Sequence, residues 1–458
     1  MRILFAAHQF FPEHYAGVEI ITLGLAKELR RRGHETFVLA PKRSIPVSDL
    51  GPGEVEEYEF EGVPVRRVGR PTEGLGRPYR LDFDNGVMAE RAGEYLDEIQ
   101  PDVIHAEHFQ GLSASVIGVF SGYDAPLVYT ATDFWTVCPV VDLRRHDGTM
   151  CTGPDLPECM KCIASRYPGS RMKLVVDSVP KPVARLAEKV ARTPVGEKMP
   201  VLGQVRALSE RPGFIREKMR GVDHVVAYTR LMEDILKRNG IGEGKVEVSP
   251  YGIDTSRIKA RPAEKTEPDG PLRVGFIGTL APHKGCDVLI QAVTKIKDAD
   301  VKLDIYGNLE RFKPFIERMR ETTGGDGRVN FAGPFQRERV GEVLNSLDVL
   351  VVPSRWYENQ PGVILEAFAA GIPVVATDLG GMSEFVRHEK NGLLFALDDA
   401  EDLAVQLTRL ANEPGLMRKL RDGIGPVKTV SDDADELEAL YAKLLEDRRA
   451  SAVESRLS

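Results

Sequence analysis

One stretch of the sequence, residues 349–377, constrains the fold more than any other. Val349–Val352 is a short apolar run of the kind that forms a buried parallel strand. A polar loop follows, and Pro361 with Gly362 then opens a helix, because the first helical amide needs no partner. Gly371 ends that helix before a second apolar run. This order of strand, loop, helix and strand predicts an α/β protein whose ligands bind at the loop, where helix N-terminal amides attract phosphate.

Two carboxylates mark this unit, Glu358 on the loop and Glu366 in the helix, with seven residues between them. Glutamate is common and usually exposed, so a solvated loop acid and a helix-surface acid are the alternative. However, Glu366 stands between Val-Ile-Leu and Ala-Phe-Ala-Ala, which predicts that it is buried. A buried carboxylate requires a hydroxyl or a cation as a partner, so Glu366 is a candidate ligand-binding residue.

The spacing of Glu358 and Glu366, with Pro361 and the run Glu-Ala-Phe-Ala-Ala-Gly-Ile-Pro-Val-Val-Ala, resembles a known signature. It is the EX7E motif of retaining nucleotide-sugar glycosyltransferases with the GT-B fold, in particular glycosyltransferase family 4. The resemblance covers nearly the whole chain and is weakest over residues 163–220. It implies two Rossmann-like domains facing across a cleft and a C-terminal helix that crosses back to the first domain. It also implies that Glu366 binds the donor ribose and that Glu358 faces the transferred sugar.

The length of 458 residues predicts two or three domains, and 42% hydrophobic with 28% charged residues is ordinary for a soluble globular protein. The net charge of −8 argues against non-specific binding to nucleic acid. No run of eighteen apolar residues occurs, and the N-terminus is too short for a signal peptide. A cytoplasmic protein is therefore expected, with five cysteines serving as thiols or metal ligands and not as disulfides.

A first domain is expected over residues 1–250, with polar residues at the carboxyl ends of its strands. Gly17 stands before a helix and is either a simple turn glycine or, as the resemblance implies, close to the donor diphosphate. His108 follows a strand at 103–105, and Asp133 follows another at 128–130. The family commonly has a His-Asp pair where Thr132 and Asp133 stand, and its histidine contacts the transferred sugar. We expect His108 and Asp133 to be catalytic, with a purely structural histidine as the alternative.

Four of the five cysteines fall within an insertion at about residues 134–165. Their spacing is C-x12-C-x7-C-x2-C, at Cys138, Cys151, Cys159 and Cys162. Four thiolates with one CxxC pair predict a structural zinc site, and an iron–sulfur cluster or free thiols are the alternatives. A site closed by four thiolates has no open position, so this metal has no predicted role in catalysis.

A basic segment follows at residues 166–220. It holds 13 Lys and Arg against 5 Asp and Glu, a net charge of +8 in a chain of net charge −8. This asymmetry predicts contact with an anionic membrane surface or an anionic acceptor, and hence peripheral association with the inner face of a membrane. Solvated helix faces are the alternative interpretation.

A second domain is expected over residues 271–430, after a stretch at 246–254 that resembles the family's interdomain hinge and a linker at 255–270. Apolar runs predict strands at 272–277, 301–307, 329–333 and 374–376. Gly278, Thr279 and Lys284 lie on the turn after the first of these, where a lysine can neutralise a diphosphate. A surface lysine is the alternative, and the family usually has arginine where Thr279 stands. Residues 431–458 are expected to form a helix that packs back on the first domain, and a tail.

The predicted function is retaining transfer of a hexose-like sugar from a UDP- or GDP-linked donor to a hydroxyl acceptor. The acceptor is lipid-linked or soluble, and the reaction belongs to bacterial cell-surface polysaccharide or glycolipid synthesis. Lys284, Thr279 and amides near Gly362 and Val363 would stabilise the leaving diphosphate. No G-x-G-x-x-G motif follows a predicted strand, which argues against a dinucleotide oxidoreductase. No Asp-x-Asp motif follows a predicted strand either, so no metal is expected in catalysis. A nucleotide-sugar epimerase and a non-catalytic sugar-nucleotide-binding scaffold are the alternatives.

Overall fold

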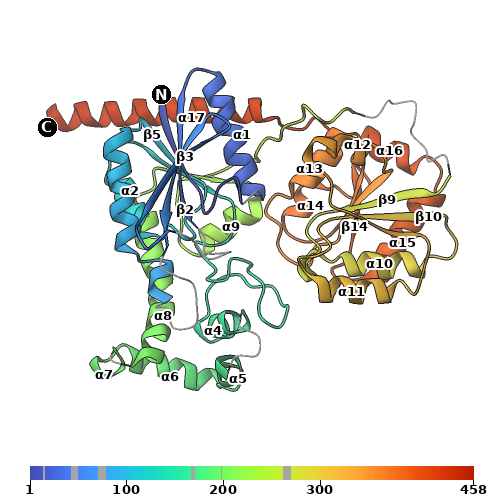
Figure 1. The fold of residues 1–458 in the computed structure, drawn as a ribbon, viewed down its shortest axis with the longest axis horizontal. Helices are drawn as coiled ribbons and strands as arrows, with labels where there is room; N and C mark the ends of the chain where they lie inside the picture. Colours follow the sequence, from blue (N-terminus) through green and yellow to red (C-terminus); the bar gives the residue numbers. More distant parts are fainter. Residues whose placement is uncertain are drawn as a thin grey trace. The chain divides into compact units, whose positions relative to one another are not determined.

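The computed structural model divides the chain into two compact units (Figure 1). Unit 1 contains residues 1–250 and 430–458, and unit 2 contains residues 251–429. The structure describes residues 1–13, 16–42, 50–70, 79–166, 171–197, 199–260 and 270–457. Most of the predicted linker (261–269) and five positions of the basic segment (167–170 and 198) therefore lie outside the described residues.

Unit 1 is built on an eight-stranded sheet of order β3-β4-β2-β1-β5-β6-β7-β8. Every neighbouring pair is parallel except β3 and β4. The strands are β1 (Arg2–Ala6), β2 (Glu35–Lys42), β3 (Val55–Phe60), β4 (Val63–Gly69), β5 (Val103–Ala106), β6 (Leu127–Ala131), β7 (His224–Ala227) and β8 (Val246–Val248). The central strands β1, β5 and β6 are almost wholly buried, as expected of parallel strands covered on both faces.

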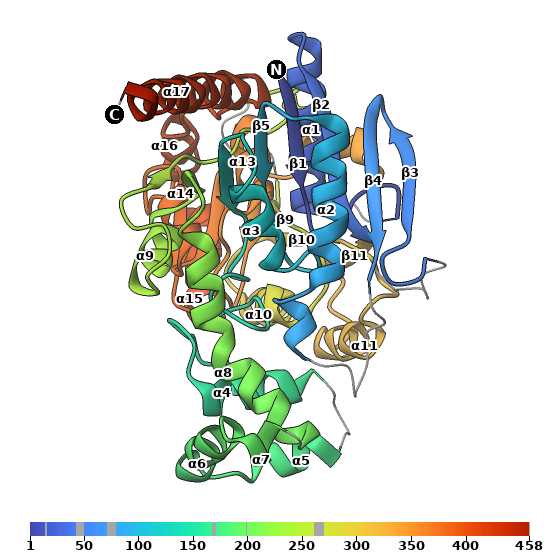
Figure 2. The ribbon, with the colours of Figure 1, turned by 90° about the vertical axis from the view of Figure 1, so that its left-hand side faces the viewer.

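Helices of unit 1 connect these strands and form a separate helical group after β6. They are α1 (Gly17–Arg31), η1 (Tyr79–Asp82), α2 (Gly86–Ile99), α3 (Ser115–Ser121), α4 (Leu156–Ser165), α5 (Arg171–Asp177), α6 (Lys181–Ala191), α7 (Pro194–Glu197), α8 (Pro200–Met219), α9 (Arg230–Arg238) and α17 (Val430–Leu457). In Figures 1 and 2, α5, α6 and α7 lie at the end of α8 that points away from the sheet.

Unit 2 is a six-stranded, all-parallel sheet of order β11-β10-β9-β12-β13-β14. Its strands are β9 (Leu272–Ile277), β10 (Val301–Tyr306), β11 (Val329–Gly333), β12 (Val349–Val352), β13 (Val374–Thr377) and β14 (Gly392–Phe395). Its helices are η2 (Pro282–Lys284), α10 (Cys286–Lys295), α11 (Lys313–Thr322), η3 (Arg337–Arg339), α12 (Val340–Asn345), α13 (Gly362–Ala369), α14 (Gly381–Phe385), α15 (Ala400–Asn412) and α16 (Leu416–Asp422).

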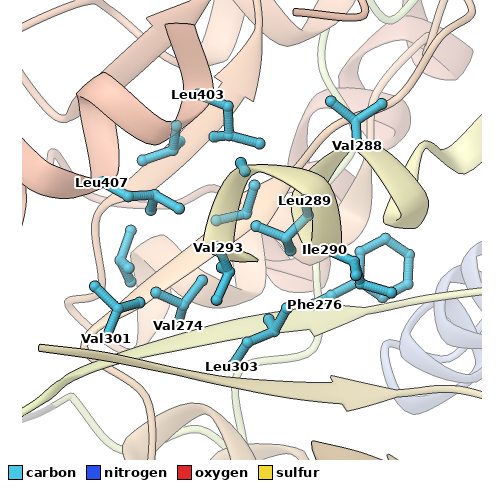
Figure 3. Close-up of a cluster of buried hydrophobic side chains, with 14 of the residues drawn as sticks. Val274, Phe276, Val288, Leu289, Ile290, Val293, Val301, Leu303, Leu403 and Leu407 are labelled. Carbon is cyan, nitrogen blue, oxygen red and sulfur yellow. The ribbon is translucent and has the colours of Figure 1, made fainter. Parts of the chain in front are cut away.

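Each unit has its own hydrophobic core. In unit 2, aliphatic side chains of β9 and β10 pack against α10, and Leu403 and Leu407 of α15 complete the same cluster (Figure 3). In unit 1, buried residues of β1 and β2 pack against α1, and Ala434, Leu437 and Tyr441 of α17 join them. The last helix is therefore part of unit 1, although the whole of unit 2 precedes it in the chain.

The predicted fold class is confirmed, since both units are α/β with sheets that are parallel apart from the β3–β4 pair, and the C-terminal helix returns to the first unit. The predicted strands at 272–277 and 329–333 coincide with β9 and β11. One expectation about the end of the chain is wrong. Where the sequence predicts a tail, α17 continues as helix to Leu457.

Candidate active site

The turn after β9 places Lys284 beside the loop after β12. Gly285 makes this close approach possible, because its φ is +69° and an added Cβ would lie 1.8 Å from the Pro353 carbonyl oxygen. Only glycine adopts that conformation without strain and leaves that space empty. Strands β9 and β12 are parallel neighbours in the sheet, so their carboxyl ends meet at the same edge. Residues 74 apart in sequence thereby become neighbours at the place where such sheets bind ligands.

Glu358 is the centre of this cluster and is 8% exposed. Its Oε1 accepts hydrogen bonds from Lys284 Nζ at 2.6 Å, from Ser354 Oγ at 2.7 Å and from Trp356 Nε1 at 2.7 Å. Burial disfavours the charged carboxylate, but the Lys284 charge and these three donors together hold the pKa of Glu358 below its ordinary value. The side chain is therefore an ionised carboxylate fixed in one orientation.

Glu366 lies on α13 and is buried as the sequence predicts, at 6% exposure. Its Oε1 accepts a hydrogen bond from Arg337 of η3, whose side chain is 46% exposed. A carboxylate has about four acceptor positions, so the Arg337 contact leaves Glu366 with capacity for further donors.

The start of α13 is held by Tyr251 and Gln360. Tyr251 donates its backbone N–H to Gln360 Oε1 at 2.9 Å and its hydroxyl to the Gln360 carbonyl oxygen at 3.1 Å. An added Cβ at Gly362 would lie 2.7 Å from the Tyr251 hydroxyl oxygen, which explains a glycine at the first helical position. Pro361 is the N-cap residue, and Val363 is half-buried in the first turn.

In unit 1, His108 and Asp133 are brought together from the ends of the neighbouring strands β5 and β6. His108 Nε2 and Asp133 Oδ2 form a hydrogen-bonded pair, and His108 Nδ1 accepts the Gln110 backbone N–H at 2.9 Å. Because Nδ1 accepts, Nε2 must carry the proton that it donates to Asp133. The Trp135 backbone N–H donates to Asp133 Oδ1 at 2.8 Å, so the carboxylate is also fixed.

Two further residues with polar contacts, His8 and Glu107, follow the neighbouring strands β1 and β5. The rings of His8, which follows β1, and His108 have centroids 4.4 Å apart, and His8 Nε2 lies 3.5 Å from Glu19 Oε1 on α1. Glu107 is buried and accepts a hydrogen bond from Thr22 Oγ1 at 2.5 Å, and burial raises the pKa of Glu107 to about 8.

Two other residues of unit 1, Gly17 and His105, have plainer surroundings. Gly17 is the first residue of α1 and is exposed, with no heavy atom within 4 Å of an added Cβ. His105 is buried between Tyr441 and Thr130, to which its two ring nitrogens are hydrogen-bonded. Burial lowers the pKa of His105 to about 3, so it is a neutral structural histidine.

The metal site predicted from Cys138, Cys151, Cys159 and Cys162 is not supported. The four residues do line one pocket, and Cys159 and Cys162 both lie on α4. However, no group of three or more His, Cys, Asp or Glu side chains in the described parts of the chain has a geometry that could hold a metal ion. Cys151 Sγ instead donates to the Gly153 carbonyl oxygen at 3.0 Å. Structural zinc and an iron–sulfur cluster both need ligand atoms that converge on one point, so both remain predictions from the cysteine spacing.

Some site residues are not predicted from the sequence. Ser354 and Trp356 lie within four residues of Glu358, so their proximity in sequence is a usable signal. His8 follows the first strand, which is a position where parallel sheets carry functional side chains. Arg337 gives no such signal, because it is 29 residues from Glu366 on an irregular segment.

Two α/β units, each with polar side chains at the carboxyl ends of adjacent strands, have the architecture of the GT-B class of glycosyltransferases. Comparison with known proteins supports this class. Residues 16–157 match the family described as "Glycosyl transferase 4-like domain", and residues 271–413 match "Glycosyl transferases group 1". The chain belongs to the glycosyltransferases of this group, the family 4 type, and is a transferase enzyme.

One curated relative is D-inositol 3-phosphate glycosyltransferase of Rhodococcus opacus, 30% identical over 88% of this chain and 80% of the relative. Among solved structures, sucrose-phosphate synthase of Thermosynechococcus elongatus has a TM-score of 0.66 at 18% identity, over 97% of this chain and 99% of the other. HepE of Anabaena in complex with UDP and glucose has a TM-score of 0.55 at 17% identity, and the match covers 100% of this chain and 99% of HepE. These two structures share the fold of this chain.

Proposed function

We propose that this enzyme transfers a sugar from a nucleoside diphosphate sugar to a hydroxyl acceptor with retention of anomeric configuration. The observation that carries the proposal is the Lys284–Glu358 pair at the carboxyl-terminal edge of the unit 2 sheet. The distance between Lys284 Nζ and Glu358 Oε1 is 2.6 Å. A fixed cation next to a fixed, ionised carboxylate suits a donor that combines an anionic diphosphate with a sugar that becomes electron-poor in the transition state.

The diphosphate would bind at Lys284. Its ammonium group has three N–H donors, and Glu358 takes one, so the others remain for phosphate oxygens. Breaking the bond between the anomeric carbon and the phosphate oxygen adds negative charge to the nucleoside diphosphate. The Lys284 charge, the Thr279 hydroxyl and the amides at Gly362 and Val363 would stabilise that charge without reorganising. Gly278 leaves room for the phosphates, and Glu366 accepts hydrogen bonds from the ribose.

The reacting sugar and the acceptor would be held by Glu358 and by the His108–Asp133 pair of unit 1. In this proposal the acceptor oxygen forms the new bond to the anomeric carbon, and its proton leaves with the nucleoside diphosphate. Gly17 would lie near the diphosphate at the start of α1. The complex of HepE with UDP favours a UDP-linked sugar as the first donor to test. For the acceptor we propose a glycan or a lipid-linked glycan of the cell surface.

A kinetic comparison of Lys284→Ala with wild type tests the proposal. We expect turnover to fall by about 10²–10³, because one positioned donor to the leaving group is lost. The matched control is Lys295→Ala on the following helix, whose ammonium has the exposed Glu401, at 2.7 Å, as its one ion-pair partner among the described residues. The assay measures nucleoside diphosphate release over a panel of UDP and GDP sugars, with product anomers assigned by NMR.

Unchanged kinetics for Lys284→Ala would remove the phosphate role of this residue. An inverted product anomer would contradict retention. Conversion of the donor sugar without an acceptor would identify an epimerase, and donor binding without turnover over the whole panel would identify a scaffold.

A further inference from the structure

Residues 171–219, here called the helical arm, carry the largest concentration of exposed apolar side chains in the described chain. The arm comprises α5, α6, α7 and α8. Eleven large hydrophobic residues are exposed among the described residues, and six are in the arm: Val175, Val183, Leu186, Val190, Met199 and Val201. Scattered single apolar residues need no explanation, but a cluster on one element marks an interaction site.

Helix α6 shows how this apolar surface is organised. Ala184 and Ala191 are buried where α6 packs on α8 and α4. Val183, Leu186 and Val190 follow at spacings of three and four and form a stripe on another face. Leu186 is 60% exposed, so the stripe points to solvent and not into the unit. Burying small alanines while exposing larger aliphatic residues is the reverse of what a helix does when its only partner is its own core.

Cations lie next to this stripe. Arg185 and Lys189 are exposed on α6, and neither has an ion-pair partner among the described residues. By contrast, Lys181 is 3.0 Å from Glu158, and Arg192 is 2.9 Å from Glu188. The outward side of α6 therefore combines an apolar stripe with two uncompensated positive charges, inside a segment of net charge +8.

We propose that the helical arm docks unit 1 onto an anionic lipid bilayer, with the α6 stripe in the boundary between headgroups and acyl chains and with Arg185 and Lys189 among the headgroups. Apolar burial and attraction to acidic lipids act together in such interfacial helices, and both kinds of side chain are present here. A nucleic acid would match the charge but would leave the aliphatic stripe in water. In Figures 1 and 2, α5, α6 and α7 of the arm lie at the end of α8 that points away from the sheet of unit 1. This inference does not depend on the proposed reaction.

Sedimentation of the full chain with vesicles tests the proposal. Wild type should bind vesicles with about 30% phosphatidylglycerol at low salt, should bind them less at high salt, and should bind pure phosphatidylcholine vesicles far more weakly. Arg185→Glu/Lys189→Glu should reduce the partition coefficient by at least about 30-fold, since each cation near an anionic surface contributes about fivefold. Leu186→Asp should reduce it by about tenfold or more, through lost apolar burial.

Matched controls come from unit 2. Lys302→Glu/Arg418→Glu makes the same change in net charge at exposed positions, and Val405→Asp changes a 55% exposed aliphatic residue on α15. Both controls should bind as wild type does. Since all altered side chains are exposed, thermal midpoints should stay unchanged, which separates lost docking from lost folding.

The proposal is overturned if wild type does not bind the anionic vesicles, or if the arm variants bind as tightly as their controls. It is also overturned if light scattering shows a dimer that Leu186→Asp converts to monomer, because the stripe would then bind a second copy of the chain.

Discussion

At the residue scale, one carboxylate oxygen organises the donor side of the site. Glu358 Oε1 accepts from an ammonium, a hydroxyl and an indole N–H, which come from two different loops. Each donor alone is an ordinary hydrogen bond, but together they keep the carboxylate ionised despite its burial. In the proposed reaction, a carboxylate held in this way needs little reorganisation when the substrate binds.

Gly285→Ala should destabilise unit 2. The change places a Cβ 1.8 Å from the Pro353 carbonyl oxygen at a residue with φ of +69°. The left-handed conformation alone costs about 1–2 kcal/mol for a non-glycine residue, and the backbone must also shift to relieve the clash. Urea unfolding measures the loss. Gly327→Ala in the same unit is the control, since nothing lies within 4 Å of its Cβ. Equal stabilities for the two variants would contradict the argument.

Glu107→Gln should change how the stability of unit 1 depends on pH. Burial first, and then the charges of Asp433 and Glu19, raise the pKa of Glu107 to about 8, against the opposing hydrogen bond from Thr22. The unfolded chain ionises near 4.5, so the stabilising effect of the neutral carboxyl is complete below that pH and is lost as pH rises toward 8. The loss is about 1.4 kcal/mol per pH unit. Because glutamine cannot ionise, the Glu107→Gln variant lacks this pH-dependent loss of stability.

Thermal unfolding of wild type and Glu107→Gln between about pH 5 and 8 measures this effect. The two proteins should have similar midpoints at the acid end, and the variant should become increasingly more stable as the pH rises. A difference that stays constant with pH would show that Glu107 does not titrate as the structure indicates.

At the element scale, the sequence predicts the buried parallel strands but does not predict the hairpin of β3 and β4 at the edge of the unit 1 sheet. Runs such as Val349–Val352 are apolar throughout and can only be buried. No strand is predicted at 55–69, because β3 is rich in glutamate. It forms through pairing with β4, where Arg66 Nε donates to Glu57 Oε1 at 2.6 Å across the two strands. Such pairing depends on a partner that local sequence patterns do not identify.

The same distinction applies to the site. The sequence alone singles out Glu358, Glu366 and Lys284 as candidates, because each lies just after a strand or within the helix that follows it. Arg337 is not, since only the tertiary fold brings η3 to α13. The cysteine prediction is not supported for a related reason. Spacing shows that four thiols are near one another in sequence, but it does not determine whether their sulfur atoms converge.

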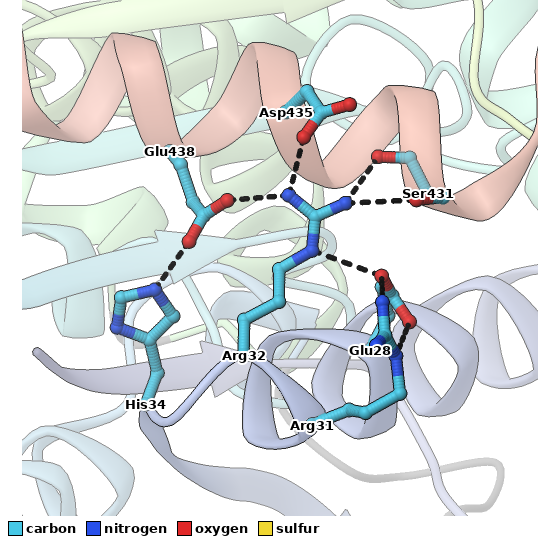
Figure 4. Close-up of polar contacts among 7 residues, drawn as sticks. All are labelled: Glu28, Arg31, Arg32, His34, Ser431, Asp435 and Glu438. Atoms are coloured by element: carbon cyan, nitrogen blue, oxygen red, sulfur yellow. Dashed lines mark hydrogen bonds and ion pairs between the residues drawn. The ribbon is translucent and has the colours of Figure 1, made fainter.

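Arg32→Ala should loosen the docking of α17 on α1. Figure 4 shows that the Arg32 guanidinium donates hydrogen bonds to Ser431, Asp435 and Glu438 of α17. The distance from Arg32 Nη2 to the Ser431 carbonyl oxygen is 2.7 Å. We expect a loss of about 1–3 kcal/mol and faster amide exchange over the first turns of α17, because several charge-assisted hydrogen bonds are lost.

The control for this change is the preceding residue. Arg31 pairs only with Glu28 on its own helix, and its side chain is 69% exposed. Arg31→Ala should therefore leave the free energy of unfolding almost unchanged. If both variants unfold alike, the contacts in Figure 4 do not hold α17.

At the scale of the whole molecule, the chain forms two cores and passes between the units twice. It leaves unit 1 at residue 250 and returns to it at residue 430, so α17 completes the unit that begins the chain. No helix of the described residues is long and apolar enough to cross a membrane. The side chains proposed to bind the donor are in unit 2, whereas the His108–Asp133 pair and the helical arm are in unit 1. The proposed donor and membrane contacts therefore belong to separately folded parts.

Two cores predict two calorimetric transitions, because each unit buries its own apolar surface. UDP at about 100 times its Kd should stabilise the unit that binds it by about 2.7 kcal/mol and raise that midpoint by roughly 5–10 °C. Gly285→Ala should lower the same transition that UDP raises, since both act on unit 2, and Arg32→Ala should lower the other. A UDP effect on the transition that Arg32→Ala lowers would place the donor in unit 1 and refute the assignment of Lys284 and Glu366. A single transition moved by all three changes would show that the units unfold together.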